Sequence, residues 1–252
     1  MPTFDISGQK ALVAGGAGDL GKAMVAALRD AGVEVVILDI AANLQETARL
    51  LTRPEGPCVH GVRADLSDRQ DLERGFHESI TLTGTLDILV NAQGIQRRHK
   101  AEEFPLSDWD DVLEINLTSV FALCQLAGRL MLAKGKGKIV NIASMQSFNG
   151  GYTIPAYAAS KAGVAQITKS FSNEWAGKGV NVNAIAPGYM DTKMTAAVKE
   201  DPVRYPRILA RIPVGRWGSA EDLCGPLLFL VSPASDYVTG VVFPVDGGML
   251  GT

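Results

Sequence analysis

Short apolar runs alternate with longer helix-like stretches along the whole chain. The runs are rich in β-branched residues and are predicted strands, at Ala11–Val13, Val33–Leu38, Val59–Val62, Leu86–Val90, Lys138–Ile142, Val180–Ile185 and Val241–Val245. Stretches with helical spacing lie between them, most clearly at Lys22–Ala31, Asp68–Leu82, Trp109–Leu132 and Ala158–Ala176. This alternation predicts an α/β fold, with parallel strands joined by helices on both faces. Because the runs are apolar throughout, we expect a doubly wound sheet of seven strands, buried on two sides.

The chain is expected to form a single domain over residues 1–252. No linker rich in Pro, Gly or Ser divides it, and no internal repeat is present. Only Gly188–Ser219 breaks the alternation, because it is longer than a usual connection between two strands. We interpret it as a lid over a substrate site, with an inserted pair of surface helices as the alternative.

The charge balance and the cysteine pattern exclude several classes of function. A formal net charge of −3 leaves no basic excess for nucleic acid, and no polybasic run suggests a membrane surface. Cys58, Cys124 and Cys224 are widely separated, which favours a reducing compartment, and they form no metal-ligand spacing with the histidines. The opening residues, MPTFDISGQK, lack the apolar stretch of a signal peptide, so we expect a soluble cytoplasmic protein without a metal site.

A glycine-rich loop connects the first predicted strand to the first predicted helix. Its glycines permit a tight turn and let backbone N–H groups approach a pyrophosphate, which the positive end of the following helix also favours. A glycine-rich turn alone is weak evidence, but this position in an α/β pattern is typical of a Rossmann-type dinucleotide-binding domain. The residues of this loop predicted to contact the dinucleotide are Gly15, Gly18, Asp19, Leu20 and Gly21.

A carboxylate ends the second predicted strand, at Asp39, 18 residues after Gly21. At that place it accepts hydrogen bonds from both adenosine ribose hydroxyls and repels a 2′-phosphate. No arginine follows within Ile40–Ala42, so NAD(H) is predicted over NADP(H). Further cofactor contacts are predicted after the third and fourth strands, at Asp65, Leu66, Asn91, Ala92 and Gly94. Asp65 could equally cap the helix that follows it.

Four polar residues are placed along the chain in a pattern that suits proton transfer. Tyr157 and Lys161 are four residues apart on one predicted helix, so their side chains share a face. Ser144 follows the fifth predicted strand, and Asn116 lies in the long helical stretch before it. Hydride transfer to a carbonyl creates an alkoxide, which a tyrosine can protonate when a nearby ammonium, together with the positive charge of the nicotinamide, lowers its pKa. Ser144 is predicted to hold the reacting oxygen, and Asn116 to anchor a water that relays protons from Lys161.

Together these segments resemble the short-chain dehydrogenase/reductase family over the full length of the chain. The resemblance rests on Gly15–Gly21, Asp65, Asn91–Gly94, Asn116, Ser144, Tyr157–Lys161, and Pro187-Gly188 followed by Thr192. It implies that the Asn-Ser-Tyr-Lys set is the active site and that the protein is a homotetramer. The contacts that it implies for the nicotinamide end of the cofactor are Tyr157, Lys161, Pro187, Gly188, Met190 and Thr192.

The chain departs from the family pattern in two cofactor loops. Asp19 stands where the middle glycine of the first loop is usual, and Ala14 replaces a threonine. The turn after the fourth strand reads Asn-Ala-Gln-Gly over Asn91–Gly94, where Asn-Asn-Ala-Gly is usual. The negative charge of Asp19 near the phosphates disfavours NADP(H) further.

Several stretches narrow the resemblance to a branch of the family that acts on sugar acids such as 2-dehydro-3-deoxy-D-gluconate and 2-deoxy-D-gluconate. They are IQRRHKAEEF, NIASMQSFNGG, NEWAGKGVNVNAIAPGYM, RIPVGRWG and ASDYV. A sugar acid needs a cation for its carboxylate, and Arg97 and Arg98 are the predicted cations. A solvated basic patch that includes His99 is the alternative. The other predicted substrate contacts are Ser144, Gln146, Tyr152 and Tyr189, with Met145 and Trp217 as further walls.

Three other functions stay open from the sequence. Gluconate 5-dehydrogenases are neighbours of the same branch. Reduction of a 3-oxoacyl thioester or a steroid is a second alternative, against which the arginine pair weighs. A non-catalytic, NAD-sensing binding protein is the third, and the presence of all four catalytic residue types weighs against it.

Overall fold

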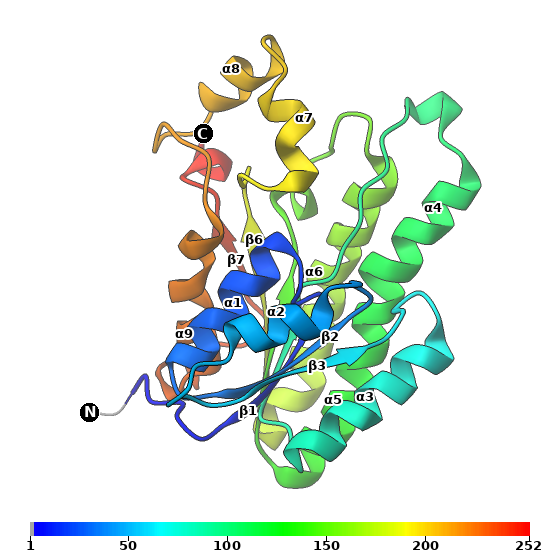
Figure 1. Cartoon of the computed structure of the whole chain (residues 1–252). Coiled ribbons are helices and arrows are strands. Elements are labelled where there is room, and N and C mark those ends of the chain that lie inside the picture. Colours follow the sequence, from blue (N-terminus) through cyan, green and yellow to red (C-terminus); the bar gives the residue numbers. More distant parts are fainter. Residues whose placement is uncertain (1–2) are drawn as a thin grey trace.

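The computed structural model describes residues 3–252 and shows one sheet of seven parallel strands (Figure 1). The strands are β1 (Lys10–Ala14), β2 (Glu34–Asp39), β3 (Val59–Arg63), β4 (Ile88–Asn91), β5 (Gly137–Ile142), β6 (Val180–Pro187) and β7 (Val242–Val245). Their order in the sheet is β3-β2-β1-β4-β5-β6-β7. This confirms the predicted α/β fold, and each predicted strand overlaps an observed one.

Helices cover both faces of the sheet (Figure 1). One layer contains α1 (Asp19–Asp30), α2 (Leu44–Leu51) and α9 (Cys224–Val231), and the other contains α3 (Arg69–Thr83), α4 (Leu106–Leu113), α5 (Ser119–Lys134) and α6 (Pro155–Trp175). Two separate apolar clusters fill the spaces between the sheet and these layers. Single 3₁₀ turns lie at Ala101–Glu103, Met145–Ser147, Ala176–Lys178, Ala220–Leu223, Pro233–Ser235 and Met249–Gly251.

The long helical stretch before β5 is one continuous run, Leu106–Lys134, in which a π-helical turn at Glu114–Thr118 joins α4 to α5. By length and composition alone this run could cross a membrane. It packs instead on the sheet through Leu123, Ala127 and Met131, which are fully buried. The run is therefore a core helix of the α/β fold.

The carboxyl ends of the central strands meet at one edge of the sheet. β1 pairs with β2 on one side and with β4 on the other, so the chain reverses its direction of winding at this point. The register places Ala14 beside Asn91, and Asn91 beside Asn141. Open α/β sheets bind ligands at such a switch point, outside the carboxyl ends of the strands.

The segment 188–219 forms a small folded unit above this edge (Figure 1). It contains a 3₁₀ turn at Lys193–Thr195 and two short helices, α7 (Ala196–Lys199) and α8 (Arg204–Leu209). A third apolar cluster joins its residues Val198, Ile212 and Trp217 to Met145 and Met249. The segment is thus packed on its own small core.

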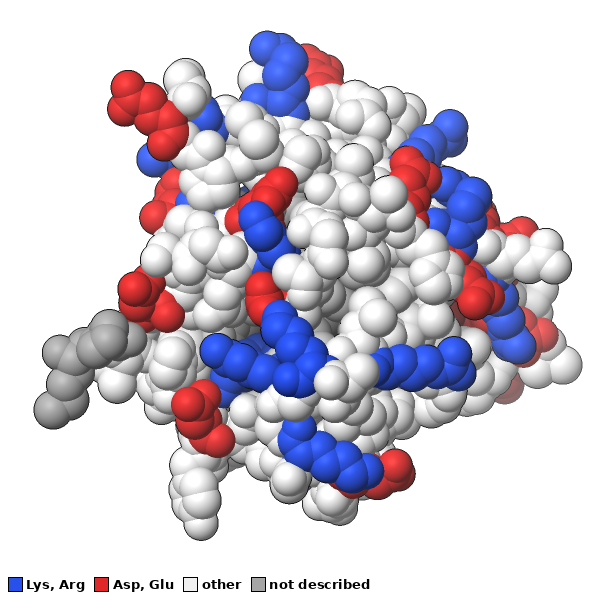
Figure 2. All heavy atoms as spheres, turned by 90° about the horizontal axis from the view of Figure 1, so that it is seen from below, with Lys and Arg blue, Asp and Glu red and all other residues white. Residues whose placement is uncertain are grey.

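The opposite end of the molecule carries ion pairs at the amino ends of the strands. Lys10 pairs with Glu34, and Lys138 pairs with Asp236 at 2.7 Å. Figure 2 views the molecule from this end and shows basic side chains across the middle of the face, with acidic side chains beside them.

Candidate active site

Two positions in the loop after β1 require glycine. Gly15 has a φ of +74°, and a Cβ there would lie 2.5 Å from the backbone nitrogen of Gln93. A Cβ on Gly21 would lie 2.2 Å from the carbonyl oxygen of Gly15. Helix α1 begins at Asp19 with Gly18 as its N-cap, so its free N–H groups open toward this loop. The loop therefore has the close backbone packing and the donor set that fit a pyrophosphate.

A cleft of about 390 Å³ extends from this loop across the ends of β2, β3 and β4. Asp39 lies in it, and its carboxylate accepts hydrogen bonds from the N–H groups of Ala17 and Ala41, at 2.9 and 3.0 Å. No lysine or arginine lines this cleft; its lining residues are Gly15, Ala17, Gly18, Asp39, Ile40, Ala41, Ala64, Asp65, Leu66, Ser67, Ala92, Gln93, Gly94, Ile95 and Ile115. The shape and the negative charge of this cleft fit the adenosine half of a dinucleotide.

Two of the predicted cofactor residues are engaged within the protein. Asp65 accepts from the backbone N–H and hydroxyl of Ser67, at 2.9 and 2.6 Å, while Asp68 caps helix α3. The alternative that Asp65 caps this helix is thus not what the structure shows. The side chain of Asn91 points into the core and donates to Asn141 at 2.8 Å, so it does not line the cleft.

Tyr157 and Lys161 lie one turn apart near the start of α6, as predicted. The Lys161 Nζ is 5.9 Å from the centre of the Tyr157 ring and donates to the carbonyl of Ile142 at 2.6 Å. Ser144 follows β5 and lies beside Tyr157 in the same cavity, and its hydroxyl accepts from the N–H of Gln146 at 3.2 Å. The structure thus brings the phenol, the ammonium and the hydroxyl together at one sheet edge.

Asn116 lies in the π-helical turn between α4 and α5. Its amide accepts from the N–H of Ile95 at 2.8 Å and donates to the carbonyl of the same residue at 2.9 Å. A Cβ on Gly94 would lie 3.4 Å from the Asn116 Oδ1 and 3.7 Å from the Lys161 Nζ. Asn116 and Lys161 therefore approach each other across Gly94, in a place where π-turns often mark a functional site.

Burial controls the electrostatics of this group in the absence of a dinucleotide. It raises the pKa of Tyr157 above its ordinary value, although the hydrogen bond with Ser144 and the charge of Arg98 oppose this shift. Burial also lowers the pKa of the Lys161 ammonium to about 8. Desolvation thus outweighs the nearby positive charge of Arg98, and the lowering of the Tyr157 pKa by Lys161 together with the nicotinamide charge stays a prediction.

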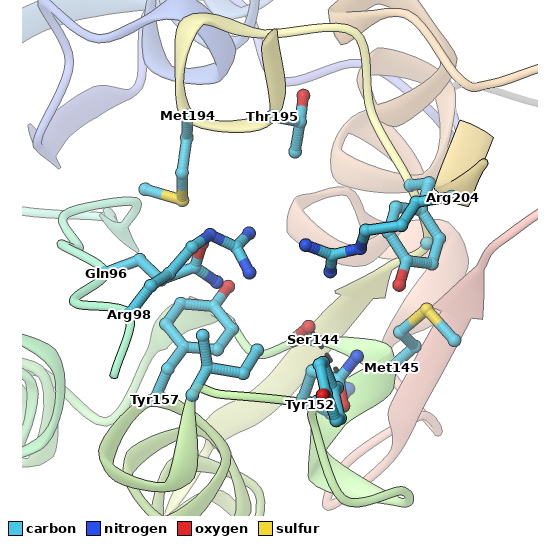
Figure 3. A pocket seen from close by; sticks show the side chains of 13 residues that line it. Gln96, Arg98, Ser144, Met145, Tyr152, Tyr157, Met194, Thr195 and Arg204 are labelled. Carbon is cyan, nitrogen blue, oxygen red and sulfur yellow. Dashed lines mark hydrogen bonds between the residues drawn. The ribbon is translucent and has the colours of Figure 1, made fainter. Parts of the chain in front are cut away.

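A cavity of about 100 Å³ adjoins Ser144 and Tyr157 (Figure 3). Arg98 lines it, but Arg97 is exposed and lies 3.8 Å from Asp108. Arg97 therefore does not line this cavity, because adjacent residues in this extended loop point in opposite directions, and its contact with the substrate stays a prediction. The predicted contacts that do line the cavity are Arg98, Ser144, Met145, Gln146, Tyr152 and Tyr189.

Trp217, predicted as a cavity wall, lies instead in the core of the 188–219 segment. Its ring is 5.3 Å from the rings of both Tyr189 and Tyr205. The cavity has other walls that the sequence analysis missed: Gln96, Ile154, Gly188, Met194, Thr195 and Arg204. No sequence signal marked Arg204, since it lies in a helix without a recognisable motif.

The comparisons with known proteins agree with this arrangement. A sequence profile described as Enoyl-(Acyl carrier protein) reductase matches residues 15–250. The 2-dehydro-3-deoxy-D-gluconate 5-dehydrogenase of Bacillus subtilis (strain 168) is 47% identical over 247 residues, which are 98% of this chain and 96% of that protein. The chain belongs to the short-chain dehydrogenase/reductase family. It is therefore an NAD(P)-linked oxidoreductase of CH–OH groups.

Other members of the family show the same likeness. The 2-dehydro-3-deoxy-D-gluconate 5-dehydrogenase of Escherichia coli (strain K12) is 44% identical, over 99% of this chain and 98% of that protein. A crystal structure from Agrobacterium tumefaciens, provisionally described as a 2-deoxy-d-gluconate 3-dehydrogenase with bound NADP, has a TM-score of 0.92 and 44% identity over 100% of both chains. A gluconate 5-dehydrogenase from Burkholderia cenocepacia J2315, in complex with NADP and tartrate, has a TM-score of 0.94 and 36% identity over 99% of this chain and 98% of that one.

Asp19, where this short-chain dehydrogenase/reductase departs from the family pattern, contacts the segment above the sheet. Its carboxylate accepts from the N–H of Lys193 at 2.8 Å. Thr192, a predicted cofactor contact, caps the same 3₁₀ turn, and Met190 is buried beside Gly218. The loop after β1 and the 188–219 segment are thus joined directly through Asp19.

Proposed function

We propose that this chain transfers a hydride between NAD(H) and a C–OH or C=O group of a sugar acid, such as 2-dehydro-3-deoxy-D-gluconate or 2-deoxy-D-gluconate. The main structural support is one cavity lined by Ser144, Tyr157 and Arg98, whose guanidinium has no ion pair among the described residues. The names of the relatives at 42–47% identity support the same substrate class.

The proposed proton chemistry assigns one task to each polar group. Bound in the cleft, the nicotinamide dinucleotide would donate or accept the hydride. Tyr157, as the general acid, gives its proton to the carbonyl oxygen during reduction, and a raised pKa keeps that proton on the phenol at neutral pH. Ser144 hydrogen-bonds the same oxygen. Lys161, held by the carbonyl of Ile142, stabilises the phenolate, and Asn116 supports the water that resupplies the proton.

The residues proposed to hold the cofactor form two groups. The adenosine and pyrophosphate half contacts Gly15, Gly18, Asp19, Leu20, Gly21, Asp39, Asp65, Leu66, Ala92 and Gly94. The nicotinamide half contacts Tyr157, Lys161, Pro187, Gly188, Met190 and Thr192. Asn91 is proposed to act through the backbone turn that follows it, because its side chain is held by Asn141.

The unpaired polar groups of the cavity favour a hydroxylated acid. The Gln146 Oε1 is buried without a hydrogen-bond partner among the described residues, so it is available to a substrate hydroxyl. Arg98 offers a charge-assisted contact to a carboxylate. A cavity of about 100 Å³ holds roughly seven to ten waters, which suits a small polar molecule better than a steroid or a long acyl chain.

Gluconate 5-dehydrogenase activity is the second candidate, favoured by the same cavity and by the gluconate-linked relatives. A panel of sugar acids, assayed by the absorbance of reduced nicotinamide, tests both proposals. We expect turnover of one or more sugar acids at a kcat/KM at least tenfold above that for the matching neutral polyol. Higher activity on a 3-oxoacyl thioester, or NADH binding without turnover of any ketone or alcohol, would contradict the proposal.

We propose NAD(H) as the preferred cofactor, although relatives are described with bound NADP. Asp39 faces a cleft with no cation, and Arg63 on the adjacent strand donates instead to the carbonyl of Ile40. Asp39→Ala should therefore shift the ratio of kcat/KM for NAD to that for NADP toward NADP, by roughly 10- to 100-fold, since it removes the ribose contacts and the repulsion.

Asp39→Asn is the matched control, because it can still accept from the N–H of Ala17 but lacks the charge. If the ratio of kcat/KM for NAD to that for NADP shifts in both variants, the charge of Asp39 determines the cofactor preference. If the ratio shifts in neither variant, Asp39 does not select the cofactor.

Further proposals concern the lid, the assembly and the location. We propose that 188–219 covers the substrate, because Met194, Thr195 and Arg204 line the cavity from above (Figure 3). A homotetramer is proposed from the family and from the exposed apolar Phe121 and Leu130 on α5. A cytoplasmic location is supported by the three free cysteines, none of which is paired.

A further inference from the structure

Two arginines face each other across the substrate cavity. Arg98 approaches from the loop after β4 and Arg204 from the first turn of α8, with their guanidinium groups turned toward the space between them (Figure 3). Within residues 3–252 neither guanidinium forms an ion pair or a hydrogen bond. Partial burial, and then the charge of Arg204, lower the pKa of Arg98 below its ordinary value.

Two carboxylates in the neighbouring segments accept hydrogen bonds from groups other than these guanidinium groups. Asp201 accepts from the backbone N–H groups of Val203 and Arg204, both at 2.9 Å, and so fixes the start of α8. Asp108 is held by His99 at 2.6 Å. The other titratable groups that act on Arg98 are the phenols of Tyr157 and Tyr189. Asp201 also attracts Arg204 through its charge, but no carboxylate of the described residues forms an ion pair with either guanidinium. An anion bound between the two partly buried cations would reduce their repulsion.

We propose that Arg204 and Arg98 form a clamp that binds the carboxylate of the substrate. The lid helix α8 then supplies the residue that selects acids over neutral polyols. This inference rests on the proposed sugar-acid function. Guanidinium groups are suited to carboxylate binding because each can form two parallel hydrogen bonds to a carboxylate. The next residue, Tyr205, packs 5.3 Å from Trp217, which holds α8 in position above the cavity. The carboxylate then lies at the lid side, and the reacting carbon is directed toward Tyr157 and Ser144.

Arg204→Gln tests the proposal, with Arg207→Gln as the matched control on the same helix. Arg207 is exposed and does not line the cavity. For the best acid of the panel, Arg204→Gln should raise KM roughly 10- to 100-fold, as expected for loss of a charge-assisted hydrogen-bonded contact, and Arg204→Lys should raise it less. Activity on D-glucitol or an uncharged ketone should change less than threefold. Arg207→Gln should leave both activities within about twofold of the wild type.

A direct binding measurement separates this inference from the proposed function. The probe is sodium D-gluconate, which is added to the enzyme–NADH complex. The shift in Tm measures its binding, and D-glucitol is the neutral comparison. A gluconate shift that disappears in Arg204→Gln but persists in Arg207→Gln supports the clamp, even if no sugar acid is turned over. A shift that persists in Arg204→Gln overturns the clamp and leaves the sugar-acid function standing. If gluconate does not bind the wild type, the clamp is wrong.

Discussion

Tyr157→Phe is expected to lower kcat about 10³-fold in both directions, the size expected when a general acid/base is removed. The phenol is the group at the floor of the cavity that can exchange a proton with a substrate oxygen hydrogen-bonded to Ser144. The ring stays in place, so NADH binding should weaken by no more than about fivefold, the value of one neutral hydrogen bond. Single-turnover absorbance measures the chemical step, and NADH fluorescence measures binding.

Tyr237→Phe is the matched control for this substitution. Tyr237 is fully exposed in the turn before β7, far from the sheet edge that carries the site. It should retain wild-type kcat and Tm. If Tyr157→Phe keeps more than a tenth of the wild-type kcat, or if NADH binding is lost along with turnover, Tyr157 is not the acid/base that we propose.

The sheet could be predicted from the sequence because both of its faces are buried. Each strand must then be apolar throughout, and this leaves a short uniform run between helices that is easy to recognise. Helices α2 and α9 were harder to predict. Helix α2 has only eight residues, and α9 contains Leu227–Val231, which is apolar on all sides and shows no helical period.

The catalytic group could be predicted because the topology fixes where its residues lie. Ser144 follows β5 directly, and Tyr157 and Lys161 share one face of α6, so parallel strands bring all three to the same edge. Glycines such as Gly15 and Gly21 are equally constrained, since any side chain there would clash with backbone atoms. Local geometry and topology determine these positions without any knowledge of distant contacts.

The substrate cavity could not be predicted in the same way, because long-range packing of irregular segments builds it. Arg97 and Arg98 look alike in the sequence, but Asp108 in α4 attracts the first, and only the second enters the cavity. Trp217 and Arg204 belong to one segment, 188–219, yet the first fills its core and the second lines the cavity. The residues next to them in the sequence do not indicate which of these side chains enters the cavity.

The sequence also does not indicate how strongly burial opposes the expected lowering of the Tyr157 pKa. Sequence spacing shows that Lys161 is one turn away, but it does not show how deeply the phenol is buried. Desolvation of the phenolate is the larger effect in the structure without dinucleotide. The expected acidification must therefore depend on groups that arrive with the cofactor and substrate.

Lys161→Met is expected to make the protein more stable at pH 7 while nearly abolishing turnover. The Lys161 side chain is 3% exposed, and burial lowers its pKa from 10.5 to about 8. A depressed lysine pKa means that the folded state disfavours the ammonium, at a cost of about 3 kcal/mol below pH 8. Removing the ammonium recovers that amount, less ~1 kcal/mol for the carbonyl of Ile142, which loses its donor. The net gain of about 2 kcal/mol raises Tm by roughly 4–8 °C.

The stability difference between Lys161→Met and the wild type should depend on pH. The stabilisation should be largest below pH 8 and shrink as the pH rises from about 8 toward 10.5. It should be lost before pH 10.5, because the folded lysine is then neutral, half of the unfolded chains are neutral at this site, and the lost hydrogen bond to Ile142 remains. Wild-type NADH binding should weaken as the pH rises through about 8, because we propose that the ammonium contacts the dinucleotide, and this step should be absent in Lys161→Met. A variant that is less stable than the wild type at pH 7, or that keeps the binding step at pH 8, would show that Lys161 is a structural residue and not the proposed cofactor contact.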